Sequence, residues 1–248
     1  MYKSKHYNFI TTPIFNILEE SVIACRGIGD GIETQTISEY ILQTTFLKMT
    51  GASEQKLKCI CWELATNDYE YRYQYLKKDT DYGECSNYKA KNAIYKELIK
   101  EIKKQDDSFD FNVIFNPNNK SEILNKVIAE VKIITNSSIF KLLDEKGFNC
   151  FINKANDFCI HNNFADPSNL LVNNLKTHFE KIVYRHRNRC AHNLVSYQEN
   201  LPTLSTLSDK DYDYNNYFFR FSLLILIDEI FIRLYKKYID ALEKNAYS

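Results

Sequence analysis

Glycine and proline are rare in this chain, and their scarcity limits the folds that it can adopt. Only 6 glycines and 4 prolines occur among 248 residues. Turn-dense sheets and repeated hairpins need these residues at their turns. With 44% hydrophobic residues, the chain is also able to bury a sizeable core. We therefore expect an all-α fold rather than an all-β or collagen-like chain.

Apolar residues recur with helical spacing along most of the chain. The pattern predicts a helix that starts at Thr12-Pro13, with the Thr12 hydroxyl as its cap. A second helix, either continuous or divided at Gly51, is expected from about 38 to 66. Residues 69–75 alternate with period two, which fits a short strand or a helix end. Further helices are predicted over 93–104 and 122–135, from Pro167-Ser168 onward, and over about 214–244.

The domain organisation is predicted from the order of these helices. No repeat period and no low-complexity linker divides the chain. We therefore predict a single domain over 1–248, with a core formed by about 12–66 and 167–244. Residues 67–165 are then a middle insertion.

The balance of charge argues against a general affinity for polyanions. Lys and Arg number 32, as do Asp and Glu, so any contact with nucleic acid has to come from a local patch. The N-terminal sequence lacks the apolar stretch of a secretory signal. The most apolar segment, 218–234, contains four charged residues and is too polar to cross a bilayer. We expect a cytoplasmic protein that has no membrane contact.

The seven cysteines form no C-x-x-C pair. Cys159 with His161 and Cys190 with His192 are candidate zinc ligands, but neither pair has a second pair at finger spacing. We therefore expect buried free thiols, no metal site and no cofactor.

The most informative segment is 184–193, with the sequence YRHRNRCAHN. Three of the seven arginines and two of the five histidines of the chain fall within eight consecutive residues, 185–192. At 100° per residue, His186 and Cys190 continue the core-facing stripe, whereas Asn188 and His192 share another face. This spacing predicts that His186 is a hydrogen-bonded, partly buried structural residue and that His192 is not.

This segment resembles the signature of the HEPN superfamily. Arg187-Asn188-x-x-x-His192 matches its R-x(4–6)-H motif with a polar residue after the arginine, and Arg185 to His192 also satisfies the longest gap. The position of the motif late in a helix, before a loop and a long last helix, is similar as well. So is the segment 46–57, which resembles the first core helix of several members. The resemblance implies a HEPN-like helical bundle that dimerises through its motif-bearing helices.

Histidine and arginine are the side chains that RNA cleavage through the 2′-hydroxyl requires. Histidine transfers protons near neutral pH, and arginine donates to two phosphate oxygens at once, so this route needs no metal. By analogy with the superfamily, Arg187 binds the scissile phosphate, His192 is the general acid or base and Asn188 positions one of them. Arg185 and Arg189 add charge that binds the substrate. Because one motif has one histidine, the resemblance implies a composite site across a two-fold interface.

The predicted function is therefore a metal-independent endoribonuclease, a toxin or an anti-phage defence effector. Its predicted partners are RNA, a second copy of the chain, and an antitoxin or regulatory partner. HEPN toxins that pair with nucleotidyltransferase antitoxins usually carry a tyrosine two residues after the histidine, where this chain has Leu194. The alternatives are a catalytically inactive HEPN domain that binds RNA or nucleotide, and a dimeric helical interaction subunit.

Two further features have competing interpretations. Glu54 is either a supporting partner of the site or a surface glutamate, and the sequence favours a surface position. The tyrosines at 69, 71, 73 and 75 either pack a helix interface, which we favour, or stack RNA bases.

Overall fold

The computed structural model describes residues 4–77, 85–140, 147–158, 163–172, 174–192 and 216–246. Within these ranges the regular elements are helices, and the only β-type contact is an isolated bridge between Asp166 and Asn169. The prediction of an all-α protein is confirmed for this part of the chain.

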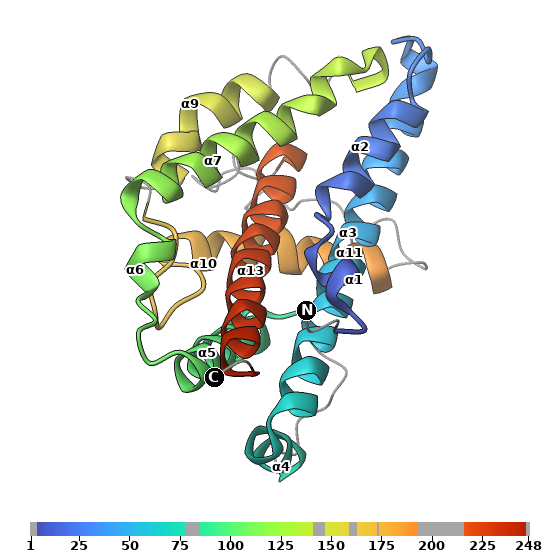
Figure 1. Cartoon of the computed structure of the whole chain (residues 1–248). Coiled ribbons are helices and arrows are strands. Elements are labelled where there is room, and N and C mark those ends of the chain that lie inside the picture. Colours follow the sequence, from blue (N-terminus) through green and yellow to red (C-terminus); the bar gives the residue numbers. More distant parts are fainter. Residues whose placement is uncertain are drawn as a thin grey trace.

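The last helix, α13, lies at the centre of the molecule, with α2 and α3 along one side and α6 and α7 along the other (Figure 1). The elements in chain order are α1 (Tyr7–Thr11), α2 (Phe15–Ala24), η1 (Ile32–Thr34), α3 (Gln35–Asn67), α4 (Tyr69–Lys77), α5 (Tyr88–Gln105), α6 (Phe111–Ile114), α7 (Pro117–Val131), η2 (Lys132–Asn136), η3 (Ser138–Phe140), α9 (Asn149–Phe158), α10 (Asn174–His178), the π-helical segment η5 (Phe179–Tyr184), α11 (Arg185–His192) and α13 (Tyr217–Ala246).

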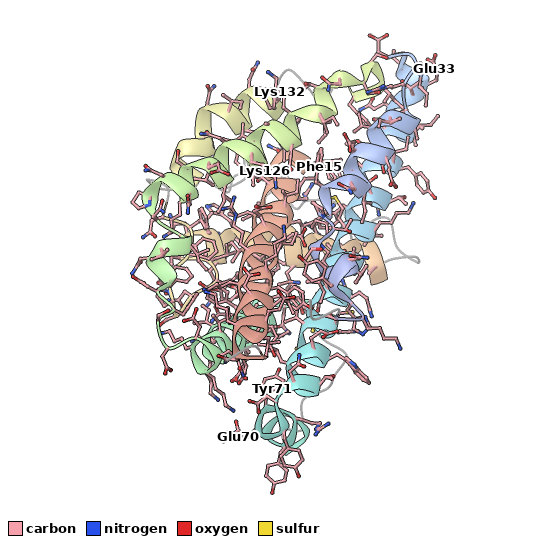
Figure 2. All side chains as sticks on the ribbon, viewed as in Figure 1. Phe15, Glu33, Glu70, Tyr71, Lys126 and Lys132 are labelled. Carbon is pink, nitrogen blue, oxygen red and sulfur yellow. The ribbon has the colours of Figure 1, made fainter. Side chains whose placement is uncertain are left out.

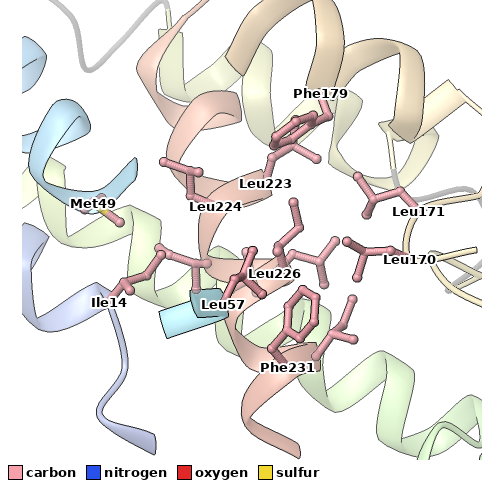
Figure 3. Packing of buried hydrophobic residues seen from close by; sticks show 14 of the residues in the cluster. Ile14, Met49, Leu57, Leu170, Leu171, Phe179, Leu223, Leu224, Leu226 and Phe231 are labelled. Carbon is pink, nitrogen blue, oxygen red and sulfur yellow. The ribbon is translucent and has the colours of Figure 1, made fainter. Parts of the chain in front are cut away.

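The core forms around α13, because this helix is buried on all sides along half of its length. Every residue from Phe218 to Ile232 is buried. A helix that is apolar around its whole circumference has to lie in the interior. Leu226 and Phe231 of α13 pack in one cluster with Leu57 of α3 and Phe179 of η5 (Figure 3).

The segment between the two predicted core regions contributes to this same cluster. Tyr95 and Leu98 of α5 and Val127 of α7 are buried in it, and both helices pack directly against α13. The helices of 85–131 therefore form part of the wall around the central helix.

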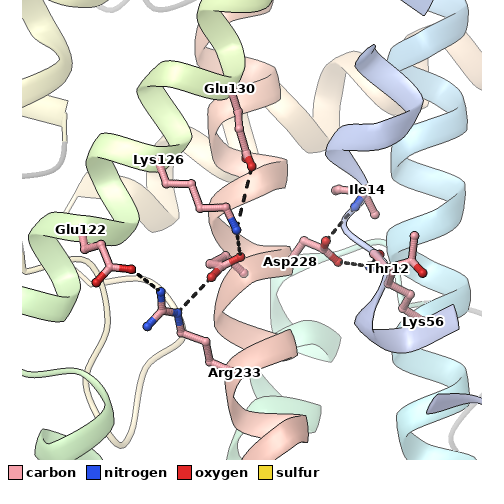
Figure 4. A network of polar contacts seen from close by, with 9 residues as sticks. Thr12, Ile14, Lys56, Glu122, Lys126, Glu130, Asp228 and Arg233 are labelled. Carbon is pink, nitrogen blue, oxygen red and sulfur yellow. Dashed lines mark hydrogen bonds and ion pairs between the residues drawn. The ribbon is translucent and has the colours of Figure 1, made fainter. Parts of the chain in front are cut away.

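Two charged residues of α13 are accommodated inside this core by paired contacts. The Asp228 carboxylate accepts a hydrogen bond from the Lys56 ammonium of α3 (2.7 Å) and one from the backbone N–H of Ile14 (2.9 Å) (Figure 4). Lys56 also donates to the carbonyl of Thr12. Burial raises the pKa of Asp228 and lowers the pKa of Lys56, and the pairing opposes both shifts. On the other side of α13, Glu229 pairs with Lys126 of α7 at 2.8 Å.

The start of the first long helix differs from the prediction. The Thr12 hydroxyl donates to the carbonyl of Asn8, in the first turn of α1, and does not cap α2. Asp228 takes the Ile14 N–H instead, and it lies 214 residues away in sequence. A distant carboxylate thus replaces the local cap that the sequence indicated.

Two other helices begin earlier than predicted because asparagines cap them. Asn87 accepts from the N–H of Ala90 at the start of α5, and Asn116 accepts from the N–H of Asn119 at the start of α7, each at 2.8 Å. Two alternatives that the sequence left open are also decided. Helix α3 continues unbroken through Gly51, and residues 69–75 belong to a helix rather than a strand.

The predicted helix start at Pro167-Ser168 is wrong. The Asp166 carboxylate accepts hydrogen bonds from the N–H groups of Ser168 and Asn169, both at 2.7 Å, and closes a turn. Helical structure begins only at Asn174.

Among the helices of the described ranges, none combines the length and apolar character that crossing a membrane requires.

The Lys56–Asp228 pair gives the first prediction. Both side chains are only 5–6% exposed, so removal of one partner leaves a buried charge without compensation. We expect Lys56→Met to lower the free energy of unfolding by about 3–5 kcal/mol, measured by urea denaturation. The double variant Lys56→Met/Asp228→Leu should lose less than the sum of the single variants.

Lys100→Met is the matched control, because the side chain of Lys100 is 61% exposed and only loosely paired with Glu97. We expect this variant to change stability by less than about 1 kcal/mol. Equal losses for Lys56→Met and Lys100→Met would contradict a special role for the buried pair.

Candidate functional site

The arginine- and histidine-rich segment lies on α11, which follows α10 and η5 crosswise to α13 and meets α3 (Figure 1). The η5 segment is π-helical, with a wider turn than an α-helix, and such segments occur often at functional sites. Arg220 of α13 donates from Nε to the Ile182 carbonyl in this segment at 3.1 Å. The contact attaches the start of α11 to the central helix.

His186 is a structural residue, as the sequence predicts. Its ring packs against Phe46 of α3 and Tyr217 of α13, with centroids 5.1 and 5.6 Å away. Its Nε2 lies 3.4 Å from the Tyr217 hydroxyl and 3.5 Å from the Cys190 sulfur. Burial, followed by the charges of Arg220 and Arg189, lowers the pKa of His186 to about 2, so the ring stays neutral.

Arg187 faces α3 and pairs with Glu54. Its Nη2 lies 3.4 Å from both carboxylate oxygens of Glu54, and its Nη1 donates to the side-chain oxygen of Asn188 at 3.2 Å. The two partners are 26% and 15% exposed, so the pair lies at the rim of the core. The expectation of a surface position for Glu54 is wrong, because this residue is the counter-charge of Arg187.

Lys91 of α5, whose charge is affected by Glu54 and Arg187, was not identified from the sequence. It is 2% exposed. Burial lowers its pKa to about 8, Glu54 opposes that shift, and Arg187 adds to it. The charges of Lys91, Lys58 and Glu54 all act on the buried Cys85 thiol, whose pKa burial raises.

A signal for Lys91 was present in the sequence. Tyr88, Lys91, Tyr95, Leu98 and Ile102 share one face of α5 at helical spacing, and the other four are all buried. A lysine in the middle of an apolar stripe is unusual, because burying a charge is costly unless it is paired.

The other predicted site residues on α11 differ in how exposed they are and in their distance from Arg187. Arg185 is exposed and Arg189 is half-buried. His192 is the last residue of α11, five residues beyond Arg187 and about 7.5 Å along the helix axis. The side chain of His192 lies outside the described residues, so its role stays a prediction.

The arrangement of thiols near the site differs from that of a metal centre. Cys190 contacts His186, and no group of three potential metal ligands occurs among the residues that the structure describes. Cys159, His161 and Leu194 lie outside those residues.

The tyrosines of α4 divide into two kinds. Tyr71 is buried in the core, as the packing interpretation predicts, whereas Tyr69 and Tyr73 are exposed. Trp62 of α3 is also exposed. The side chain of Tyr75 lies outside the described residues.

A separate groove lies between α2 and α7 and is lined by Phe15, Lys126, Glu130 and Lys132. Figure 2 labels three of these side chains, Phe15, Lys126 and Lys132. It contains none of the predicted site residues. Its Lys126 already pairs with Glu229 of α13, so at least one of its charges serves helix packing.

Comparisons with known proteins give no match: no family model, no curated protein and no solved structure resembles this chain closely enough to report.

The neutral, half-buried ring of His186 gives the second prediction. Since its pKa is far below that of a free histidine, the unfolded chain binds a proton below about pH 6.5 and the folded chain does not. Stability contributed by the neutral ring is therefore complete above pH 6.5 and is lost as the pH falls. We expect wild type to lose up to about 2 kcal/mol more than His186→Phe between pH 7 and pH 5.

The measurement is urea unfolding of both proteins at the two pH values. The second histidine buried in the fold, His178, is present in both and serves as an internal control. Identical losses in wild type and variant would mean that His186 takes up a proton in the folded state.

Proposed function

We propose that this chain is a metal-independent endoribonuclease of the HEPN type, which cleaves RNA by attack of the 2′-hydroxyl on the adjacent phosphate. The observation that carries the proposal is the environment of Arg187. A half-buried guanidinium is held at a helix junction by Glu54 and Asn188, five residues before a histidine that ends the same helix.

The proposed chemistry assigns one task to each side chain. One histidine takes the proton of the 2′-hydroxyl, the 2′-oxygen forms a bond to phosphorus, and the bond to the 5′-oxygen breaks as that oxygen receives a proton. Arg187 donates to the non-bridging oxygens, where negative charge accumulates. The products are a 2′,3′-cyclic phosphate and a 5′-hydroxyl. Asn188 orients Arg187, while Arg185 and Arg189 attract the RNA backbone.

Two histidines are needed for the two proton transfers, and each chain supplies one in this motif. His186 is excluded as the second, because it is neutral and packed between Phe46 and Tyr217. A second copy of the chain with its α11 facing the first would supply the missing His192. The proposed enzyme is therefore a homodimer.

The proposed biological role is arrest of growth through RNA cleavage, as a toxin or an anti-phage defence effector under the control of an antitoxin or regulatory partner. The alternative is a HEPN domain that binds RNA or nucleotide without cutting it. The basic character of α11 is compatible with both, because Arg187 pairs with Glu54 while Arg185 on the same helix is exposed. Strand scission distinguishes them.

The third prediction concerns RNA cleavage in EDTA. We expect wild type to cut RNA and leave 2′,3′-cyclic phosphate ends. Arg187→Ala and His192→Ala should each reduce the rate by about 10²–10⁴-fold, the usual contribution of a positioned acid or base and of charge stabilisation. Gel analysis with end mapping on tRNA and total RNA provides the measurement.

Arg26→Ala is the matched control, because Arg26 is an exposed arginine outside α11. Its rate should equal that of wild type. RNA that stays intact while binding persists would favour the non-cleaving alternative, and cleavage by both site variants would exclude the proposed site.

The fourth prediction tests the composite site. Arg187→Ala and His192→Ala chains are unfolded and refolded together, so that mixed dimers form. Each variant dimer lacks either Arg187 or His192 entirely, whereas a mixed dimer retains one of each, so we expect it to cut faster than either variant refolded alone and more slowly than wild type, which has both histidines. Sedimentation at the assay concentration should show dimers, whereas full activity of a monomer would contradict the two-chain site.

A further inference from the structure

Helix α4 exposes two tyrosines and an arginine on one face. Tyr69, Arg72 and Tyr73 occupy positions i, i+3 and i+4, which lie side by side on a helix. The two tyrosines are 74% and 50% exposed. The Arg72 guanidinium lies over the Tyr69 ring, 5.2 Å from its centroid. We call these three residues the outer face of α4.

The inner side of α4 attaches the helix to the core. Tyr71 is buried, and its backbone N–H donates to the Asp68 carboxylate at 2.8 Å, which caps the start of the helix. Asp68 also pairs with Lys104 of α5. The backbone that carries the outer face is therefore anchored to a neighbouring helix before any ligand binds.

The acidic side chain of α4 is turned away from the outer face. Glu70 pairs with Lys104 at 3.4 Å and accepts a hydrogen bond from Gln74 at 3.3 Å. Around the helix, Glu70 and Arg72 lie about 160° apart. The outer face therefore combines two aromatic rings with a positive charge.

Planar rings beside a guanidinium match the chemistry of unpaired RNA bases. Bases stack on tyrosine rings and on arginine planes, and arginine also contacts the phosphates that link the bases. A helix that docks on a protein groove typically presents an apolar stripe instead. Isoleucines are exposed on other elements, such as Ile23 on α2 and Ile32 on η1. Since a duplex hides the faces of its bases, the outer face fits a single strand.

The outer face lies within reach of an RNA strand that is bound at the candidate site. Helix α3 runs from Glu54, the partner of Arg187, to its end at Asn67, and α4 starts two residues later (Figure 1). The helix rises about 20 Å between Glu54 and Asn67. A stacked strand rises about 3.4 Å per nucleotide, so roughly six nucleotides cover this length.

Resting on the proposed function, we propose that the outer face of α4 stacks unpaired bases of the RNA whose phosphate Arg187 binds. The substrate class is then single-stranded RNA of roughly six nucleotides or more. Tyr69 and Tyr73 bind bases through their rings, and Arg72 binds a neighbouring phosphate.

The fifth prediction concerns the affinity for a labelled single strand, measured by fluorescence anisotropy. The probe is a 2′-O-methyl RNA of about twelve nucleotides, twice the expected span. It lacks a free 2′-hydroxyl, so the proposed route does not cut it. Tyr69→Ala and Tyr73→Ala should each weaken binding by about 5- to 100-fold, the usual worth of one stacked base. Tyr69→Phe and Tyr73→Phe should bind as wild type does, because stacking uses the ring.

Arg72 has a different signature in the same assay. Arg72→Ala should lower the slope of log affinity against log salt by about 0.7, the value for one phosphate contact on a single strand. The two tyrosine-to-alanine variants should keep the slope of wild type, because stacking releases no counterions.

Tyr40→Ala is the matched control, because Tyr40 is 69% exposed near the other end of α3. It should bind the single strand as wild type does. A duplex of the same sequence should bind wild type and Tyr69→Ala equally, since its paired bases are not available for stacking. All these variants change exposed side chains, so their melting temperatures should equal that of wild type.

Three outcomes would overturn the proposal. The first is a wild type that does not bind the single strand. The second is wild-type affinity in the double variant Tyr69→Ala/Tyr73→Ala, and a change of oligomeric state in that variant would then assign the outer face to a protein contact. The third is an equal loss for single strand and duplex, which would indicate a general effect of charge or folding.

The proposed nuclease activity is tested separately from this binding. Should RNA cleavage be absent while the tyrosine pattern holds, only the nuclease proposal fails. Cleavage by wild type together with unchanged affinity in both tyrosine-to-alanine variants rejects only the stacking of bases on α4.

Discussion

The ion pair between Lys56 and Asp228 joins three segments of the chain in the least polar part of the fold. Asp228 lies on a helix that is buried on every side, where an isolated charge is not tolerated. Two donors compensate it, the Lys56 ammonium and the Ile14 N–H, and Lys56 donates in turn to the Thr12 carbonyl. The start of α2 and the registers of α3 and α13 are therefore set together.

The register of α3 also places the candidate site. Glu54 and Lys58 lie two residues on either side of Lys56, so a helix fixed at Lys56 presents them at defined positions on its opposite side. Glu54 then meets Arg187 of α11, whose own start is held to α13 by the contact of Arg220 with the Ile182 carbonyl. The central helix α13 thus positions both Glu54 on α3 and Arg187 on α11.

The charges of the site differ from those of the core. In the core, the buried charges of Lys56 and Asp228 match each other. At the site, Glu54 pairs with Arg187 at 3.4 Å, and both lie at the rim of the core, 15% and 26% exposed. A partly exposed cluster of arginines on α11 favours an anionic ligand.

Local patterns in the sequence determined the class of the fold and much of its helical content. Helical spacing with few glycines and prolines gives the all-α structure, and the same spacing places His186 on the inner face of α11. These features depend on residues within one or two turns, which is the range over which backbone preference and amphipathic spacing act. The starts of α5 and α7 also depend on adjacent asparagines, although the predicted starts at 93 and 122 missed these caps.

Only the tertiary structure decided the contacts between residues far apart in the sequence. Asp228, and not Thr12, accepts the Ile14 N–H at the start of α2. Glu54 pairs with Arg187, and Lys91 is buried. No short window contains both members of these pairs, since 133 residues separate Glu54 from Arg187. The sequence therefore identified the arginine of the candidate site, and the packing of α3, α5 and α11 decided which charges surround it.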